Sequence, residues 1–143
     1  MAPTHVLVAL DGSPLADEAL RHALETYDCE VTVLNVLTPI GSGMSEGGVR
    51  ERGDERVTEA EERAEAVVAA AREQTDAYGQ DVTTVIETGD PAEVIVGYVN
   101  EADVDHVIMG GHGGDIDGLV SRLLGTVATT VVSEAPTTVT VVR

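Results

Sequence analysis

One stretch of the sequence combines residue types and spacing that suit the binding of an anion. The segment Met109-Gly110-Gly111-His112-Gly113-Gly114 places four glycines in five positions, at the end of an apolar run. A strand that opens into a glycine-dense turn and then a helix offers bare backbone N–H groups to an anion. A second site, Gly125-Thr126-Val127, adds a threonine hydroxyl as a further donor. The pattern predicts that these two glycine sites hold the phosphates of a nucleotide.

Catalytic chemistry has less support in the same region. No Ser, Cys or acid is arranged around His112 by motif, so we expect at most slow hydrolysis rather than efficient turnover. Asp115 and Asp117 resemble part of a calcium loop, but the downstream acidic ligands are missing, and we expect both to be solvated. An enzyme that uses His112, or a metal held by these two acids, is the third hypothesis. Arg122 is equally consistent with a phosphate contact and with a surface position on the last helix.

The residue types present exclude three other motifs that bind nucleotides or phosphate. A P-loop needs a Gly-Lys pair, and the chain contains no Lys. Gly41-x-Gly43 follows the second apolar run but lacks the spacing of a dinucleotide-binding fingerprint. A receiver domain would share the predicted sheet, but it also needs a Lys. The glycine sites therefore belong to none of these motifs.

The composition fits one domain over residues 1–143 with an aliphatic core. A chain of this length buries about two-thirds of the surface that it exposes when unfolded, and 43% of its residues are hydrophobic. Because there is no Phe or Trp, we expect Val, Ala, Leu and Ile to fill the core. Cys29 is the only cysteine, which excludes an internal disulfide and a cysteine-based metal site and favours a buried small hydrophobic residue.

The charge balance is strongly acidic. There are 26 acidic residues against 8 basic ones, all of them Arg, and the net charge is −18. Nucleic acids and anionic membranes bind cationic patches, so we expect neither as a partner. Acidic excess without Lys resembles the proteins of salt-loving archaea, which predicts a halophilic protein. No signal peptide or membrane span is evident, which predicts a cytoplasmic location.

Short apolar runs alternate with amphipathic stretches, which predicts an α/β fold: a single-domain, open, five-stranded parallel sheet with helices on both faces, in a Rossmann-like three-layer sandwich. Ligands of such sheets bind beyond the carboxyl ends of the strands, where the strand order reverses. Asp11, Val36, the Gly110 turn and a loop at 38–52 that we expect to be mobile all fall at such ends. The expected strands are His5–Leu10, Val31–Leu37, Val82–Thr88, Val104–Met109 and Thr137–Val142, and the expected helices are 14–27, 54–78, a helix opened by Asp90-Pro91, and Ser121–Ser133.

Several motifs of the chain resemble those of the universal stress protein family, in its ATP-binding branch. The resemblance covers essentially the whole chain, and the paired opening and glycine motifs are specific. It implies an adenine-nucleotide alpha hydrolase-like fold. The matching segments are VLVALDGS at 6–13, VLNV at 33–36, DPA at 90–92, VIMGGHG at 107–113, GTVA at 125–128 and the ending TTVTVVR at 137–143.

The resemblance also implies a role for each matching residue. Ala9 and Leu10 would line the adenine side of the site, and Val36 would read the adenine edge with its backbone. Asp11 would lie by the ribose or by the phosphate-bound metal. The implied ligand is ATP, or AMP or another adenine nucleotide, and Mg²⁺ or Mn²⁺ would arrive with it. The phosphate-binding part would comprise Met109, Gly110, Gly111, His112, Gly113, Gly125, Thr126 and Val127.

The spacing of the glycine sites departs from the family pattern. The family places nine residues between its first pair of glycines and the next glycine, whereas eleven separate Gly113 from Gly125. The surplus segment 114–118 must bulge outward if Gly125 is to reach the same place, and it brings two acids near the phosphates. The second hypothesis is therefore a structural or interaction module of the same fold that has lost nucleotide binding.

The last apolar run, at 137–142, alternates between threonine and valine. This pattern predicts a strand at or near a sheet edge, where unpaired backbone groups can pair with another chain. In the family that the chain resembles, this strand forms the contact between two copies. The resemblance therefore implies a homodimer through the C-terminal strand.

Overall fold

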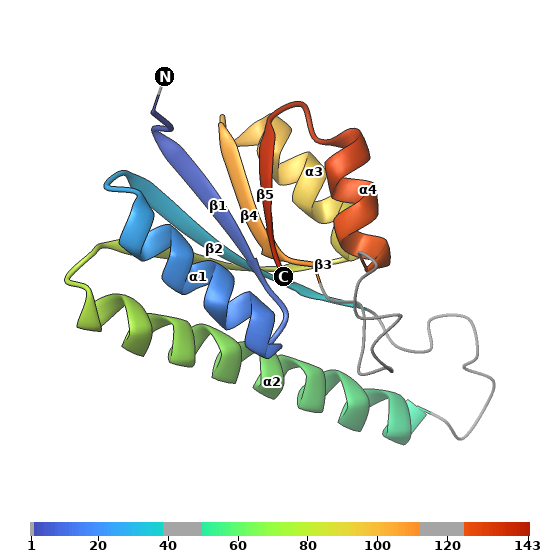
Figure 1. Cartoon of the computed structure of the whole chain (residues 1–143). Helices are drawn as coiled ribbons and strands as arrows, with labels where there is room; N and C mark the ends of the chain where they lie inside the picture. The colour runs from blue at the N-terminus through green and yellow to red at the C-terminus, as the bar shows by residue number, and fades with distance from the viewer. Residues whose placement is uncertain (1, 39–49, 112–124) are drawn as a thin grey trace.

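The computed structural model describes residues 2–38, 50–111 and 125–143, which form alternating strands and helices (Figure 1). In chain order the elements are β1 (His5–Leu10), α1 (Pro14–Thr26), β2 (Glu30–Leu37), α2 (Arg50–Ala77), β3 (Val82–Thr88), α3 (Pro91–Glu101), β4 (His106–Gly110), α4 (Thr126–Glu134) and β5 (Thr138–Val142).

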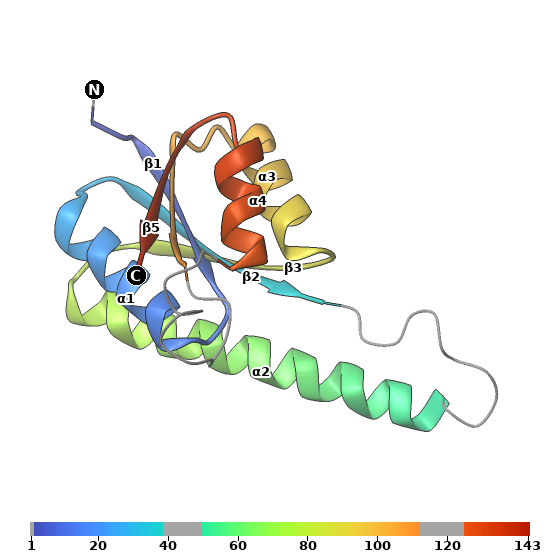
Figure 2. The same ribbon diagram turned by 45° about the vertical axis from the view of Figure 1, so that its right-hand side comes forward.

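All neighbouring strands of the sheet are parallel, in the order β3-β2-β1-β4-β5. The chain builds outward from β1 to β3, and then crosses back to place β4 and β5 on the other side of β1. The strand order therefore reverses between β1 and β4. Helices α1 and α2 cover one face, and α3 and α4 cover the other (Figures 1 and 2). The predicted five-stranded, three-layer α/β fold is confirmed.

Side chains that alternate along the central strands fill two separate cores. On the α1/α2 face, Val6 and Val8 of β1 pack with Leu20 of α1. On the α3/α4 face, Leu7 and Leu34 pack with residues of α3 and α4. Both cores are built from Val, Leu, Ala and Ile with one Met, as expected of a chain without Phe or Trp. In the part of the chain that the model describes, no helix is both long and apolar enough to cross a membrane.

Local sequence signals set the start of two helices. The Ser13 hydroxyl accepts a hydrogen bond from the Ala16 N–H at 3.2 Å, and Pro14 occupies the first turn of α1. Asp90 caps α3 in the same way, with Pro91 next. The predicted helix starts at residue 14 and at Asp90-Pro91 are confirmed, because capping depends on residues only three positions apart in the chain.

Three predicted boundaries are wrong by two residues or more, and the others agree to within one residue. Helix α2 begins at Arg50 rather than at 54, so the last three residues of the predicted 38–52 loop are helical, while 39–49 lie outside the described residues. Strand β4 begins at His106 rather than at Val104, because Asp103 adopts a positive φ of 53° and the chain is still turning there. Helix α4 begins at Thr126 and does not continue back toward the predicted start at Ser121, because Gly125 is extended and not helical; residues 121–124 themselves lie outside the described residues.

Candidate functional site

A pocket of about 700 Å³ opens at the carboxyl ends of β1, β2 and β4, where the strand order reverses. Ligands of open α/β sheets bind at this place, because loops and helix N-termini diverge there. The residues that line it are Ala9, Leu10, Asp11, Ser13, Pro14, Ala16, Leu34, Asn35, Val36, Thr38, Pro91, Ile95, Met109, Gly110, Gly125, Thr126, Val127 and Ala128.

Most of the predicted site residues meet in this pocket. Gly111 is buried next to the pocket without lining it. His112 and Gly113 lie outside the described residues, as do the two acids and the arginine between the glycine sites. The predicted residues that line the pocket are Ala9, Leu10, Asp11, Val36, Met109, Gly110, Gly125, Thr126 and Val127.

One wall of the pocket is apolar. Ala9, Met109 and Val36 project from β1, β4 and β2 on the α3/α4 face, where Ile95 of α3 packs against them. The register between β1 and β2 ends at Leu10 and Asn35, so Val36 extends past the end of β1. A flat, uncharged group such as a nucleobase fits such a wall, because it buries apolar surface on both of its faces.

Another part of the lining is polar and carries one formal charge. The Asp11 carboxylate accepts a hydrogen bond from the Ser13 N–H at 2.9 Å through Oδ1. Gly12 between them has a φ of +85°, a conformation that side chains disfavour, so the turn keeps Asp11 at the pocket mouth. Among the described lining residues, Asp11 is the only charged side chain. An anionic ligand would need its charge balanced by backbone dipoles or by a cation that it brings.

Three helices begin at the pocket, and one of them has its N-terminus open. The first turns of α1 and α3 are capped by Ser13 and Asp90, and each contains an acidic residue. In α4 the capping position is Gly125, which makes no side-chain cap, and the first turn has no acid. Within the described residues, the first N–H groups and the positive dipole end of α4 are thus available to an anion. In α1 and α3 a side-chain cap accepts one of these N–H groups, and the acidic residue of the first turn offsets the dipole.

Gly111 brings the two glycine sites together. Its carbonyl accepts the Gly125 N–H at 2.8 Å, and its own N–H donates to the Val142 carbonyl at 2.8 Å. The surplus residues between the glycine sites therefore do not keep Gly125 away from the pocket. The N–H groups of Gly111 and Gly125 are bound to carbonyls. Within the described residues, the donors left for an anion are therefore the Thr126 N–H and hydroxyl and the N–H groups of Val127 and Ala128.

The lack of a side chain at Gly110 is required by α1. A Cβ there would lie 3.0 Å from the Leu15 carbonyl carbon and 3.1 Å from the Ala16 nitrogen. These are backbone atoms of the first turn of α1, which cannot move without moving the helix. From the sequence, glycine at this position was explained by a close approach to a phosphate. The structure adds a second reason, the packing of α1, which the sequence does not reveal.

Asn35 is the site residue that sequence reasoning missed. It is a buried amide in a mainly apolar strand, and it lines the pocket. Its Nδ2 donates to the Leu10 carbonyl at 2.8 Å, which ties the end of β2 to the end of β1. An amide in the otherwise β-branched and aliphatic run VTVLNVL was the available signal. Ser13, Pro14, Ala16, Leu34, Thr38, Pro91, Ile95 and Ala128 were also not predicted to line the pocket.

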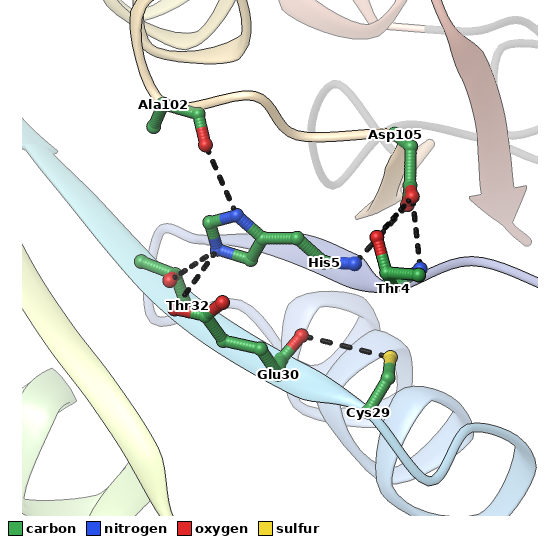
Figure 3. A network of polar contacts seen from close by, with 7 residues as sticks. All are labelled: Thr4, His5, Cys29, Glu30, Thr32, Ala102 and Asp105. Carbon is green, nitrogen blue, oxygen red and sulfur yellow. Dashed lines mark hydrogen bonds and ion pairs between the residues drawn. The ribbon is translucent and has the colours of Figure 1, made fainter.

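A second polar cluster lies at the opposite end of the sheet, at the start of β1. Its members hydrogen-bond to one another (Figure 3). His5 Nδ1 donates to the Ala102 carbonyl at 3.2 Å, so its Nε2 accepts from the Thr32 hydroxyl at 2.8 Å. The Thr4 N–H, and then its hydroxyl and the His5 N–H, hold the pKa of Asp105 below its usual range. The cluster fastens the start of β1 to the turn before β4. Within the described ranges, no group of three or more His, Cys, Asp or Glu side chains is arranged to hold a metal.

Comparison with known proteins agrees with the geometry. Residues 3–143 match the model of the universal stress protein family. No curated protein matches the chain. Among solved structures, the universal stress protein UspA from Lactobacillus plantarum is 22% identical, with 100% of this chain and 99% of that chain covered and a TM-score of 0.83.

Two other similar structures are described as nucleotide complexes. A universal stress protein in complex with cAMP is 21% identical, with 100% of this chain and 99% of that chain covered and a TM-score of 0.72. A universal stress protein family member from Arabidopsis thaliana with AMP bound is 21% identical, with 98% and 91% covered and a TM-score of 0.68. At this identity the likeness establishes the fold that the three proteins share with this chain.

Proposed function

Because the chain belongs to the universal stress protein family, we propose that it is a stress-response factor that binds an adenine nucleotide in the pocket between β1 and β4. The proposed ligand is ATP, with AMP and other adenine nucleotides as alternatives within the same class. Two structural relatives are described with AMP or cAMP bound, which supports this class of ligand. We expect no efficient turnover, and hydrolysis that is slow at most.

The observation that carries the proposal is the pairing of an apolar wall with an open helix N-terminus. The wall of Ala9, Val36 and Met109 suits the base, and the amino end of α4 suits a phosphate. Asp11 lies at the same mouth, where its carboxylate can accept hydrogen bonds from ribose hydroxyls. Apolar, anion-binding and acceptor groups thus line one pocket, as a nucleotide requires.

The charges of the pocket fit a nucleotide that carries a divalent cation. A polyphosphate brings several negative charges to a wall whose one described charge is also negative. Mg²⁺ or Mn²⁺ would offset that repulsion, and Asp11 Oδ2 is the oxygen that can face it directly or through water, since Oδ1 accepts from Ser13. The cation would supply charge balance to the phosphates, while the chain supplies Asp11 and the α4 donors.

We further propose that the protein is a homodimer that pairs through β5 in the cytoplasm of a salt-loving cell. β5 is an edge of the sheet, as predicted. Glu134 is the only charged residue between Gly125 and Val142, in a chain in which 24% of residues are charged. Such an uncharged segment suits burial against a second copy, because no charge loses its water. The remainder of the acidic surface suits solvation in concentrated salt.

Nucleotide-dependent stabilisation tests the proposal directly. A ligand that binds only the folded state raises its stability, by about 2.7 kcal/mol at one hundred times its Kd. Purified protein in high salt should show a higher unfolding temperature with Mg-ATP, AMP or cAMP than with the same concentration of inorganic phosphate. A folded protein that shows no shift at millimolar nucleotide would favour the second hypothesis, an interaction dimer of this fold that binds no nucleotide.

A further inference from the structure

Gly111 fixes both ends of the segment that contains α4 and β5. It binds the N–H of Gly125, the residue before α4, and the carbonyl of Val142, the last residue of β5. Between these ends, α4 passes into β5 through a turn of three residues, 135–137. One buried residue beside the pocket therefore holds the first and last residues of this segment, which we call the α4–β5 unit (125–142).

The two edges of the sheet differ in their link to the pocket. Neither β3 nor β5 contributes a lining residue. At the end of β3, the Gly89 N–H donates to the Leu37 carbonyl of β2 at 2.8 Å, so that edge is held to its neighbouring strand. At the end of β5, Val142 is held by Gly111, whose other bond runs to the start of α4. Of the two edge strands, β5 alone is joined to the proposed phosphate-binding helix end by hydrogen bonds among the described residues.

We propose that nucleotide binding at the amino end of α4 locks β5 onto the sheet. This inference rests on the nucleotide site proposed above. Edge strands open locally, at a lower free energy than the whole molecule unfolds. When the α4–β5 unit opens, both bonds of Gly111 break and the helix end leaves the pocket. A ligand on that helix end must dissociate first, so it raises the free energy of this opening.

The same linkage works in the other direction. A partner that pairs with β5 holds the α4–β5 unit closed. The factor by which this partner raises the affinity for nucleotide equals the factor by which nucleotide raises the affinity for the partner. In the homodimer proposed above, nucleotide and partner would each favour the other. Nucleotide would then control how readily β5 is presented for pairing.

Two matched variants make the local openings measurable. The Thr140 hydroxyl of β5 lies 2.7 Å from His106 Nε2, and the Thr84 hydroxyl of β3 accepts from Arg72 Nη2 at 2.9 Å. Thr140→Ala and Thr84→Ala each remove one such bond and loosen one edge. Hydrogen exchange of the backbone amides of both edges is then followed in each variant, with and without Mg-ATP, or AMP if AMP gives the larger thermal shift.

The coupling predicts a difference between the edges. At a nucleotide concentration of one hundred times Kd, exchange of the β5 amides in Thr140→Ala should slow about a hundredfold, while the β3 amides in Thr84→Ala change little. A thermal shift accompanied by equal slowing at both edges, or by none at β5, would overturn the coupling and leave the nucleotide site intact. The absence of any thermal shift would overturn the nucleotide site, and the coupling with it.

Discussion

Gly110 is the residue whose replacement tests how closely α1 packs against the end of β4. In Gly110→Ala the new Cβ would lie 3.0 Å from backbone and Cβ atoms of Leu15, which cannot give way cheaply. We expect a loss of about 1–3 kcal/mol in the free energy of unfolding, the range for overpacked positions. Because α1 begins at the pocket, the nucleotide-dependent thermal shift should shrink as well.

Gly97→Ala is the matched control for this substitution. Gly97 lies inside α3, and a Cβ there meets nothing within 4 Å. Alanine is the better helix former, so this variant should gain about 0.5–1 kcal/mol in the free energy of unfolding. Urea denaturation of both variants measures the two effects. Equal stabilities of Gly110→Ala and the parent protein would show that α1 does not require the close approach.

Asp105 should make the stability of the protein fall in acid. Its pKa is lowered by the Thr4 N–H at 2.8 Å, and further by the Thr4 hydroxyl and the His5 N–H. Because the folded-state pKa lies below the unfolded one, the stabilisation is complete above about pH 4 and is lost as the pH falls through the lowered pKa. Asp105→Ala should cost about 1–3 kcal/mol near neutral pH, toward the lower end because the carboxylate is partly exposed.

The pH dependence of Asp105→Ala separates the lost charge from a lost contact. The difference in stability between the parent protein and the variant should be constant from about pH 7 to 8, where His106 is not titrating, and should shrink below about pH 4. Asp105→Asn keeps the shape of the side chain but removes its charge. Its free energy of unfolding should therefore fall less in acid than that of the parent protein, as in Asp105→Ala. A difference that stays unchanged down to pH 2 would contradict the assignment.

At the level of helices, a substitution at the amino end of α4 should change nucleotide affinity without lowering the stability of the ligand-free protein. Thr126 is exposed in the first turn of α4 and lines the pocket. In Thr126→Asp the carboxylate would interact favourably with the helix dipole, by about 0.3–1 kcal/mol, and would repel a phosphate at the same place. The ligand-free protein should be as stable as the parent, while nucleotide affinity falls by more than about tenfold, since repulsion of 1.4 kcal/mol already has that effect.

Thr129→Asp supplies the control for position. Thr129 is also exposed on α4, one turn further on, and it does not line the pocket. The Thr129→Asp variant should therefore retain the nucleotide-dependent thermal shift. Titration of Mg-ATP followed by calorimetry measures both affinities. Equal affinities in the two variants would place the phosphate elsewhere than at the amino end of α4.

The sequence predicts the elements whose signals are local, and it misplaces those that depend on distant contacts. The caps at Ser13 and Asp90 mark the starts of α1 and α3 because the bonding partners are three residues away. The start of α4 depends on the bond between Gly125 and Gly111, across a segment of the chain with no periodic signal. The same contact, invisible in the sequence, decides which backbone N–H groups can reach a phosphate. Half of the residues that line the pocket were predictable, because strand ends gather at one edge of a parallel sheet.

Across the molecule, the dominant property is a net charge of −18 on 143 residues. Like charges repel more strongly in the compact state than in the unfolded chain, so the charge lowers stability in dilute salt. Salt shortens the range of this repulsion from about 10 Å at 0.1 M to about 3 Å at 1 M. The unfolding temperature should therefore rise steeply between 0.1 and 1 M KCl. Nucleotide binding should gain over the same range, because a phosphate approaches the same negative surface.

Substitutions on the outer face of α2 distinguish two effects of salt: screening of charge repulsion, and a general strengthening of hydrophobic burial. Glu59, Glu61 and Glu62 are exposed on this helix, and replacing all three with Gln removes three negative charges without touching the core. The triple variant should be more stable than the parent protein at 0.1 M KCl, and the two should converge at 1 M, since screened charges no longer repel. If salt acted only by strengthening burial, the two proteins would gain stability in parallel. Parallel thermal melting curves across the salt series would therefore rule out charge repulsion as the cause.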